Sequence, residues 1–160
     1  MKTIKINENE YVLEYSFKAV EHKETVQKMF NVMSGAYLVK DADPEAAEAN
    51  KGKALATMIN GVSEMVADVP HIVKTAFYAG LLENHELSEE EAYQLMKEYM
   101  KENKYSFNKL FEDIKACMED DGFFDLSGLN DMMEKMSQNM TAAQNKKSAK
   151  RASKKSTSAN

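Results

Sequence analysis

The chain has 160 residues, of which 43% are hydrophobic and 29% are charged, so it is long enough for one domain with its own core. No apolar run approaches the ~20 residues that a membrane-spanning helix needs, and the N-terminal MKTIKINENE lacks the apolar part of a secretory signal. These features predict a soluble cytosolic protein. The single cysteine, Cys117, excludes a disulfide within the chain.

The net charge of −5 is unevenly distributed along the chain. Residues 141–160 contain six basic side chains and no acidic one, whereas the remainder has 15 basic and 26 acidic side chains, or −11. A protein that binds nucleic acid should have its basic face on the folded part, so this distribution argues against such a fold. The basic residues of the tail are Lys146, Lys147, Lys150, Arg151, Lys154 and Lys155.

The N-terminal residues 1–15 predict a β-hairpin. Residues 3–6 and 11–15 alternate apolar and polar side chains, and Asn7-Glu8-Asn9 between them supplies turn formers. Because an isolated hairpin is only marginally stable in water, this one must pack on helices or on another chain.

Helical patterns follow the hairpin. Ser16 is a candidate cap for a short helix, and an apolar stripe over residues 26–33 predicts the next helix, which Gly35 ends. Residues 37–39 fit either a short strand or a helix. Asp43 and Pro44 mark the start of a longer helix, which should end at Val69 because a residue before proline disfavours the helical region.

The centre of the chain predicts two helices and a short joint between them. Pro70 suits the first turn of the first helix, whose apolar face runs to Leu82, and Glu83-Asn84-His85-Glu86 forms a polar loop. Ser88 and Glu91 have the spacing of a capping box for the second helix, with three acidic residues in its first turn.

The remainder of the chain predicts two more helices and a disordered tail. One helix starts near Ser106 and ends at Asp120-Asp121-Gly122, after which Phe123 and Phe124 should return to the core. Ser127 is a candidate cap for the last helix, and residues 141–160 have no large apolar side chain to bury. We therefore expect a mainly α fold: a compact bundle of about six helices with a small β-hairpin, forming one domain over residues 1–140.

No arrangement of residues suitable for catalysis or metal binding is found. Neither Gly122 nor Gly128 places ligands at both the first and the last position of a calcium-binding EF-hand loop. The three histidines and Cys117 have no helical spacing that would bring two of them together on one metal. Acidic runs at helix ends are typical of solvated surfaces. We expect a binding protein rather than an enzyme, with no cofactor and no metal.

Twelve methionines are present, and four of them lie in the last predicted helix. Methionine side chains fill irregular cores, but they also adapt to different partners at protein-binding surfaces. For Met58 and Met96 we favour the core. For Met132, Met133, Met136 and Met140 both interpretations stay open.

Residues 3–120 resemble the tail assembly chaperones of long-tailed bacteriophages and related prophages. The resemblance lies in the N-terminal KINENEYVLEYSFKAVEH and in AFYAGLLENHELSEEEAYQLMKEY, where residues 78–82 and 87–91 form the best motif. The predicted helix over residues 43–69 and the part after Asp120 are longer than in compact members of that family.

The resemblance implies a protein that binds the tape measure protein, keeps it soluble and recruits major tail tube subunits around it. Such a protein acts in the bacterial host cytoplasm and is not part of the mature virion. The hairpin edge and the apolar stripes also permit self-association. We place the partner contact at the joint and on the last helix, although the same side chains could instead fill the core. The residues of this hypothesis are Phe77, Tyr78, Leu81, Leu82, Tyr93, Met96, Met132, Met133 and Met136. The alternative function is a helical adaptor or regulator whose basic tail contacts nucleic acid.

Overall fold

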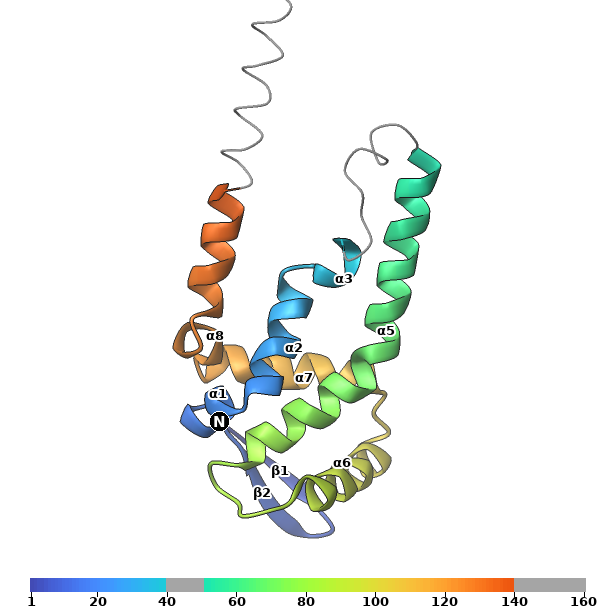
Figure 1. Ribbon diagram of the computed structural model, residues 1–160. Helices are drawn as coiled ribbons and strands as arrows, with labels where there is room; N and C mark the ends of the chain where they lie inside the picture. Colours follow the sequence, from blue (N-terminus) through green and yellow to red (C-terminus); the bar gives the residue numbers. More distant parts are fainter. Residues whose placement is uncertain (40–50, 140–160) are drawn as a thin grey trace, which may run out of the picture.

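A computed structural model describes residues 1–39 and 51–139, except for the side chains of residues 38, 39 and 51–54. The fold is mainly α with a small two-stranded antiparallel sheet, as the sequence predicts (Figure 1). The elements are β1 Lys2–Ile6, β2 Asn9–Leu13, α1 Phe17–Glu21, α2 Lys23–Met33, α3 Ala36–Val39, α5 Lys51–Leu81, α6 Glu89–Asn103, α7 Phe107–Asp120, α8 Phe123–Leu126 and a last helix over residues 129–139. The predicted start of a helix at Asp43 and the tail over residues 141–160 lie outside the described residues.

The predicted β-hairpin is confirmed. Ile6 pairs with Asn9, and the two turn residues Asn7 and Glu8 have φ angles of 47° and 67°. Positive φ at both positions is the signature of a type I′ turn, whose twist matches that of the strands. One face of the hairpin enters the core with Ile4 and Leu13, so the sheet is stabilised by the helices beneath it.

The C-terminal end of α5 holds the hairpin by its backbone. The Glu14 N–H donates to the carbonyl oxygen of Gly80 at 2.8 Å, and the Val12 N–H donates to Nε2 of His85 at 2.9 Å. The fully buried Tyr15 ring lies over Gly80, where a side chain would leave no room for it. Two backbone N–H groups in and next to β2 thus find acceptors in α5 and in the loop that follows it.

The expected capping box of α6 is confirmed, and α7 begins at the predicted place, where Ser106 caps it. Ser88 accepts a hydrogen bond from the Glu91 N–H, and the Glu91 carboxylate accepts one from the Ser88 N–H at 2.8 Å, which completes a capping box. Ser106 accepts from the Lys109 N–H at 3.2 Å in the same way. These local signals set where α6 and α7 begin.

The prediction that one helix ends at Val69 and another begins at Pro70 is wrong. α5 continues through Pro70 as a single helix of 31 residues. Proline removes one backbone hydrogen bond and its ring crowds the preceding turn, which bends a helix, and α5 changes direction near its middle in Figure 1. Packing on both sides of Pro70 outweighs the local signal, because Val69 and Ile72 are both buried.

Two smaller expectations around α3 and α8 are resolved. Residues 37–39, which fitted a strand or a helix, belong to the helix α3. Phe123 and Phe124 enter the core as predicted, on the short helix α8. Ser127 does not cap the last helix, because it ends α8 and its hydroxyl donates to the carbonyl oxygen of Phe124 at 3.3 Å. Gly128, with a φ of 73°, turns the chain before the last helix begins.

The core lies between the hairpin, the C-terminal half of α5 and the helices α6, α7 and α8. Its largest fully buried side chains include Tyr15, Phe77, Phe123, Met96 and Ile114. Among the described residues, no helix is both long and apolar enough to cross a lipid bilayer.

We predict that Gly80→Ala lowers the free energy of unfolding by about 1–3 kcal/mol. The added Cβ would lie 2.7 Å from Cζ and 2.8 Å from the hydroxyl oxygen of Tyr15, which is fully buried and cannot move away freely. Urea denaturation followed by circular dichroism measures the loss. The control is Gly80→Ala in a Tyr15→Leu background, where the ring is absent and the added methyl group should cost less. An equal cost in both backgrounds would contradict this account.

Candidate protein-binding surface

The N-terminal half of α5 extends beyond the body of the protein (Figure 1). It presents an apolar face to solvent. Five large apolar side chains on it are between 39% and 59% exposed. They lie on one side of the helix, as their spacing requires. These residues are Leu55, Met58, Ile59, Val62 and Val66.

Four of these residues follow a strict heptad spacing, which we call the α5 seam: Leu55, Ile59, Val62 and Val66. The same alternation of four and three residues continues through Val69, Val73, Ala76 and Gly80. Those four are buried against the rest of the protein. One continuous apolar face is therefore covered in its C-terminal half and uncovered in its N-terminal half. A helix that packed on the α5 seam would extend the existing core packing.

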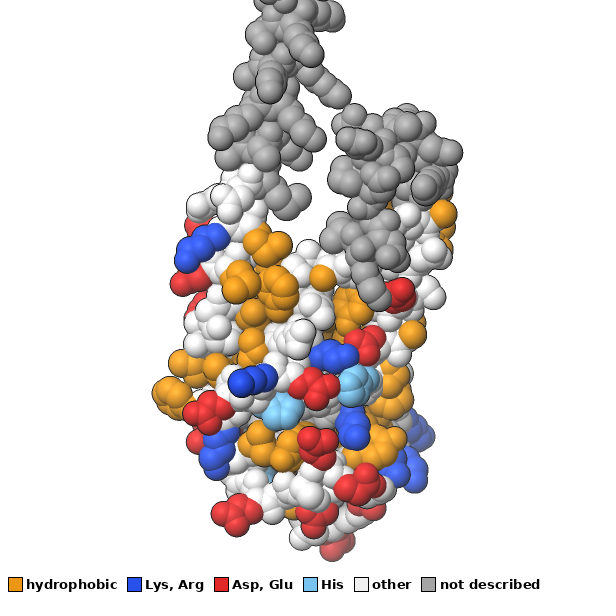
Figure 2. All heavy atoms as spheres, in the orientation of Figure 1, with side chains coloured by type: hydrophobic (Ala, Val, Ile, Leu, Met, Phe, Trp, Pro, Cys, Tyr) orange, Lys and Arg blue, Asp and Glu red, His pale blue; other side chains and the backbone are white. Residues whose placement is uncertain are grey.

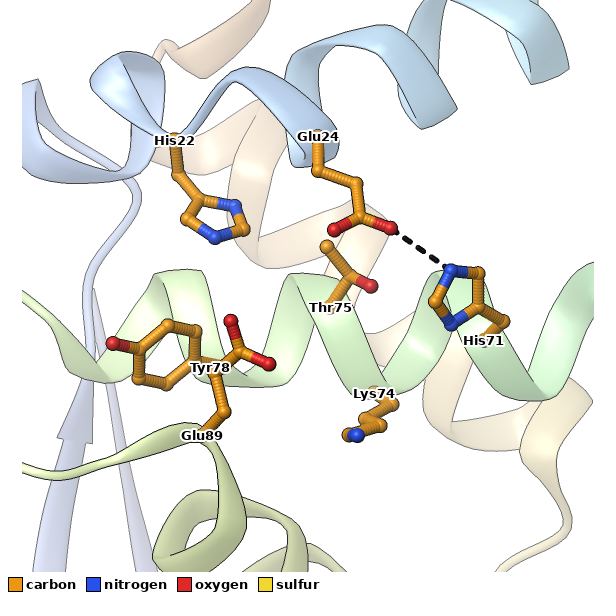
Figure 3. A pocket seen from close by; sticks show the side chains of 7 residues that line it. All are labelled: His22, Glu24, His71, Lys74, Thr75, Tyr78 and Glu89. Carbon is orange, nitrogen blue, oxygen red and sulfur yellow. Dashed lines mark ion pairs between the residues drawn. The ribbon is translucent and has the colours of Figure 1, made fainter.

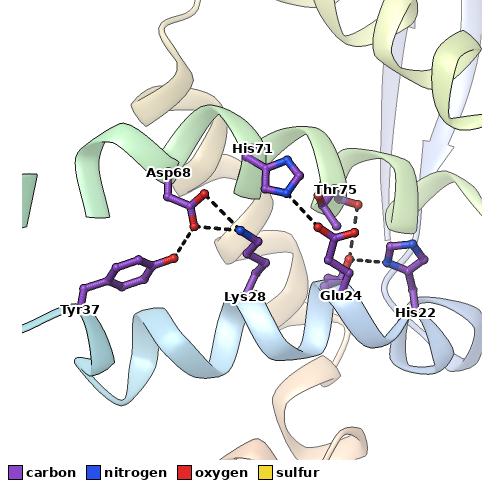
Figure 4. A network of polar contacts seen from close by, with 8 residues as sticks. His22, Glu24, Lys28, Tyr37, Asp68, His71 and Thr75 are labelled. Atoms are coloured by element: carbon purple, nitrogen blue, oxygen red, sulfur yellow. Dashed lines mark hydrogen bonds and ion pairs between the residues drawn. The ribbon is translucent and has the colours of Figure 1, made fainter. Parts of the chain in front are cut away.

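The opposite face of α5 is occupied by α2 and α3. Lys28 of α2 donates to both carboxylate oxygens of Asp68 at 2.9 and 3.1 Å, and the Tyr37 hydroxyl donates to the same carboxylate (Figure 4). Glu24 pairs with Nε2 of His71 at 2.8 Å. Asp68 precedes Pro70 and His71 follows it, so these contacts hold both sides of the bend in α5 against α2.

Partial burial by itself raises the pKa of Asp68. The hydrogen bonds from Tyr37 and Lys28, together with the charge of Lys28, more than offset this effect and leave the pKa below its ordinary value. Burial and the hydrogen bond to Asp68 raise the pKa of Tyr37, which keeps its hydroxyl protonated as a donor. At neutral pH, Asp68 is thus an ionised acceptor and Tyr37 a protonated donor.

A second apolar surface lies on the last helix and on α8 before it. Met132 and Met136 are 50% and 37% exposed, Met133 is partly exposed, and Leu126 is 43% exposed. Figure 2 shows hydrophobic side chains gathered around the last helix. Beside this helix, an open depression of about 520 Å³ lies between α2, α7 and α8, with Met33 and Phe124 among its lining residues. Two apolar surfaces are therefore available on separate helices.

Three residues that we expected to contact a partner belong to the core. Phe77, Leu81 and Met96 are each at most 1% exposed. They lie on the faces of α5 and α6 that pack against each other and against the hairpin, so a partner could reach them only if the core opened. The expectation that Met96 is a core residue is confirmed, and its place in the contact hypothesis is dropped.

The other three residues at the joint are partly exposed but engaged by neighbours. The Tyr78 ring meets the His22 ring edge to face, with centroids 5.6 Å apart. The ammonium groups of Lys74 and Lys97 lie over the Tyr93 ring, 5.1 and 4.9 Å from its centre. Leu82 is partly exposed next to the loop. The joint is therefore a small mixed surface rather than an apolar groove.

A cavity next to Tyr78 is too small to bind a substrate. Its volume is about 30 Å³, close to that of one water molecule. Figure 3 shows the residues that line it. Two of its lining residues are linked through Thr25. The Thr25 hydroxyl donates to the carbonyl oxygen of Thr75 at 3.3 Å, so the 2.9 Å contact between His22 and Thr25 requires Nδ1 of His22 to donate. Among residues 1–39 and 51–139, no group of three or more histidine, cysteine or acidic side chains could hold a metal ion.

The residues of the α5 seam were visible in the sequence as an apolar stripe but were not assigned to a binding surface. Met58, which flanks the seam, was expected in the core, and this expectation is wrong because it is 52% exposed. The stripe has the pattern of a core helix, and the pattern alone does not show that its covering partner is missing. The apolar heptad spacing that continues from Leu55 to Gly80 indicates a single long helix. The expected helix break at Pro70 divides this pattern into two shorter stripes, so its continuity is missed.

Comparisons with known proteins give no indication of the function of this chain. No family model, no curated protein and no solved structure matches this chain.

We predict that Asp68→Asn destabilises the protein by about 1 kcal/mol at pH 7, because Lys28 and Tyr37 lose a charged acceptor that is partly screened by solvent. The folded-state pKa of Asp68 is lowered from 3.8, so its contribution is complete above that value and is lost as the pH falls below it. Urea denaturation at pH 7 and near pH 3 should therefore show the two proteins converging in acid. Asp131→Asn, at an exposed position on the last helix, is the control. A difference that stayed constant with pH would contradict the assignment.

Proposed function

We propose that this protein is a phage tail assembly chaperone, which binds the tape measure protein and keeps it soluble until tail tube subunits enclose it. The observation that carries the proposal is the α5 seam, a heptad-spaced apolar face left uncovered on a projecting helix. The resemblance in the hairpin and in residues 78–91 points to the same role.

The α5 seam matches the apolar stripe that a long helical client needs to have covered. A tape measure helix exposes an apolar stripe until the tube surrounds it, and such a stripe drives aggregation. A helix with the same periodicity can lay that stripe along the α5 seam and bury it by knobs-into-holes packing. The net charge of −11 outside residues 141–160 keeps the resulting complex soluble.

Recruitment of tube subunits requires a second contact that stays open while the client is bound. The last helix supplies a separate apolar surface with Met132 and Met136, whose flexible side chains adapt to different shapes. We assign the client to the α5 seam and the tail tube protein to the last helix. The protein then acts in the bacterial host cytoplasm during assembly and leaves before the virion is complete.

The test of the client site is co-expression with the tape measure protein of the same phage. We predict that the double variant Ile59→Lys/Val66→Lys lowers the soluble yield of the tape measure protein at least about tenfold, because two ammonium groups would be buried against apolar side chains. Asn60→Lys is the matched control: it adds a charge to the same exposed turn of α5 but on another face of the helix. Circular dichroism confirms that each variant is folded.

The outcomes separate the proposal from the nucleic-acid alternative. Equal yields with the seam variant and with Asn60→Lys would reject the α5 seam as the client site. If the intact chain fails to solubilise the tape measure protein but binds DNA with a steep salt dependence that deletion of residues 141–160 removes, the adaptor function replaces this proposal.

A further inference from the structure

We propose that, in the absence of a client, two copies of this chain pair through their α5 seams as a two-fold antiparallel helix pair. The proposal concerns a second copy and does not depend on the proposed chaperone function. It rests on the order of side chains along the seam, on what flanks the seam, and on the surface that the pair would bury.

The α5 seam is complementary to itself when one copy is turned end to end. With the two-fold axis midway between residues 60 and 61, Leu55 of one copy lies against Val66 of the other, and Ile59 lies against Val62. The same pairs recur on the other side of the axis, which gives four consecutive apolar layers. Two-fold interfaces require such a self-complementary patch, and antiparallel coiled coils build their core from such layers.

The flanks of the seam favour an identical partner. Residues 55–63 include no charged side chain, so two copies meet without repulsion between like charges. Ala56 and Ser63 on one flank are small and permit close approach of the helices, whereas Met58 on the other flank adds flexible apolar surface.

The buried surface reaches the size that a specific but weak pair needs. The seam and Met58 are each about half exposed, so together they offer on the order of 500 Å² per copy and a pair buries about 1,000 Å², the lower limit of specific interfaces. A dimer of micromolar stability is expected, weak enough to open for a client that covers more of the helix.

Pairing leaves the contacts of α5 with the body intact. Val66 and Asp68 are two residues apart, and at 100° per residue they lie on opposite faces of the helix. Asp68 faces Lys28 and Tyr37, so the α5 seam points away from α2 and α3. The antiparallel direction also places the two bodies at opposite ends of the pair, because each helix projects from its own body (Figure 1).

Sedimentation equilibrium of the full chain between about 5 and 200 µM tests the pair. We expect a reversible monomer–dimer equilibrium whose dissociation constant rises at least about tenfold in Val62→Lys, with a charge at the centre of the seam, and changes little in the control Asn60→Lys. A chain that stays monomeric at 200 µM would overturn the proposal, as would an equal effect of both variants with folding intact.

Disulfide crosslinking tests the antiparallel register. Under mild oxidation, an equal mixture of Ile59→Cys and Val62→Cys should form crosslinked dimers more readily than either variant alone. In the antiparallel pair, position 59 of one copy lies against position 62 of the other, and not against its own position 59. The native Cys117 is 4% exposed and stays out of reach. Faster crosslinking of each variant with itself would indicate parallel helices and overturn the proposed pair.

Neither experiment contains the tape measure protein. A negative result in these two experiments therefore does not contradict the chaperone function, and a negative co-expression test does not contradict the dimer.

Discussion

The apolar repeat along α5 is the constraint on which the rest of the structure depends. From Val69 to Gly80 it is the side of α5 that faces the core. From Leu55 to Val66 the same repeat has no cover among the described residues. Burial of such side chains stabilises a fold or a complex by about 25 cal/mol per Å², and the exposed half of the repeat does not make this contribution to folding.

Polar contacts with α2 and α3 fix the exposed half of α5 relative to the body. Pro70 weakens the helix where it leaves the body, and Asp68 and His71 hold α2 on either side of that point. Because Asp68 and the α5 seam lie on opposite faces, α2 and α3 brace the helix without covering the seam. A partner that bound the α5 seam would therefore meet a surface that is already positioned, which would lower the entropy lost on binding.

The motif that carries the resemblance has a structural role at its centre. Gly80 accepts the hydrogen bond from Glu14 and leaves room for Tyr15, so the segment Phe-Tyr-Ala-Gly-Leu receives the N-terminal hairpin. Phe77 and Leu81 beside it are core residues. These residues of the motif therefore dock the hairpin on α5 and pack in the core.

The sequence by itself determined the features whose causes are local. The Asn7-Glu8 turn, the Ser88 capping box and the stop at Gly122 each depend on residues a few positions apart, and each lies where the sequence predicts it. The tertiary structure decided whether α5 stops at Pro70 and which apolar stripes become core. A local proline signal costs a few kcal/mol and is outweighed by packing on both sides of it, and a stripe shows its period without showing whether another element covers it. Phe77 and Val62 illustrate this limit: both lie on apolar stripes of one helix, and only the arrangement of distant elements buries the first and leaves the second exposed.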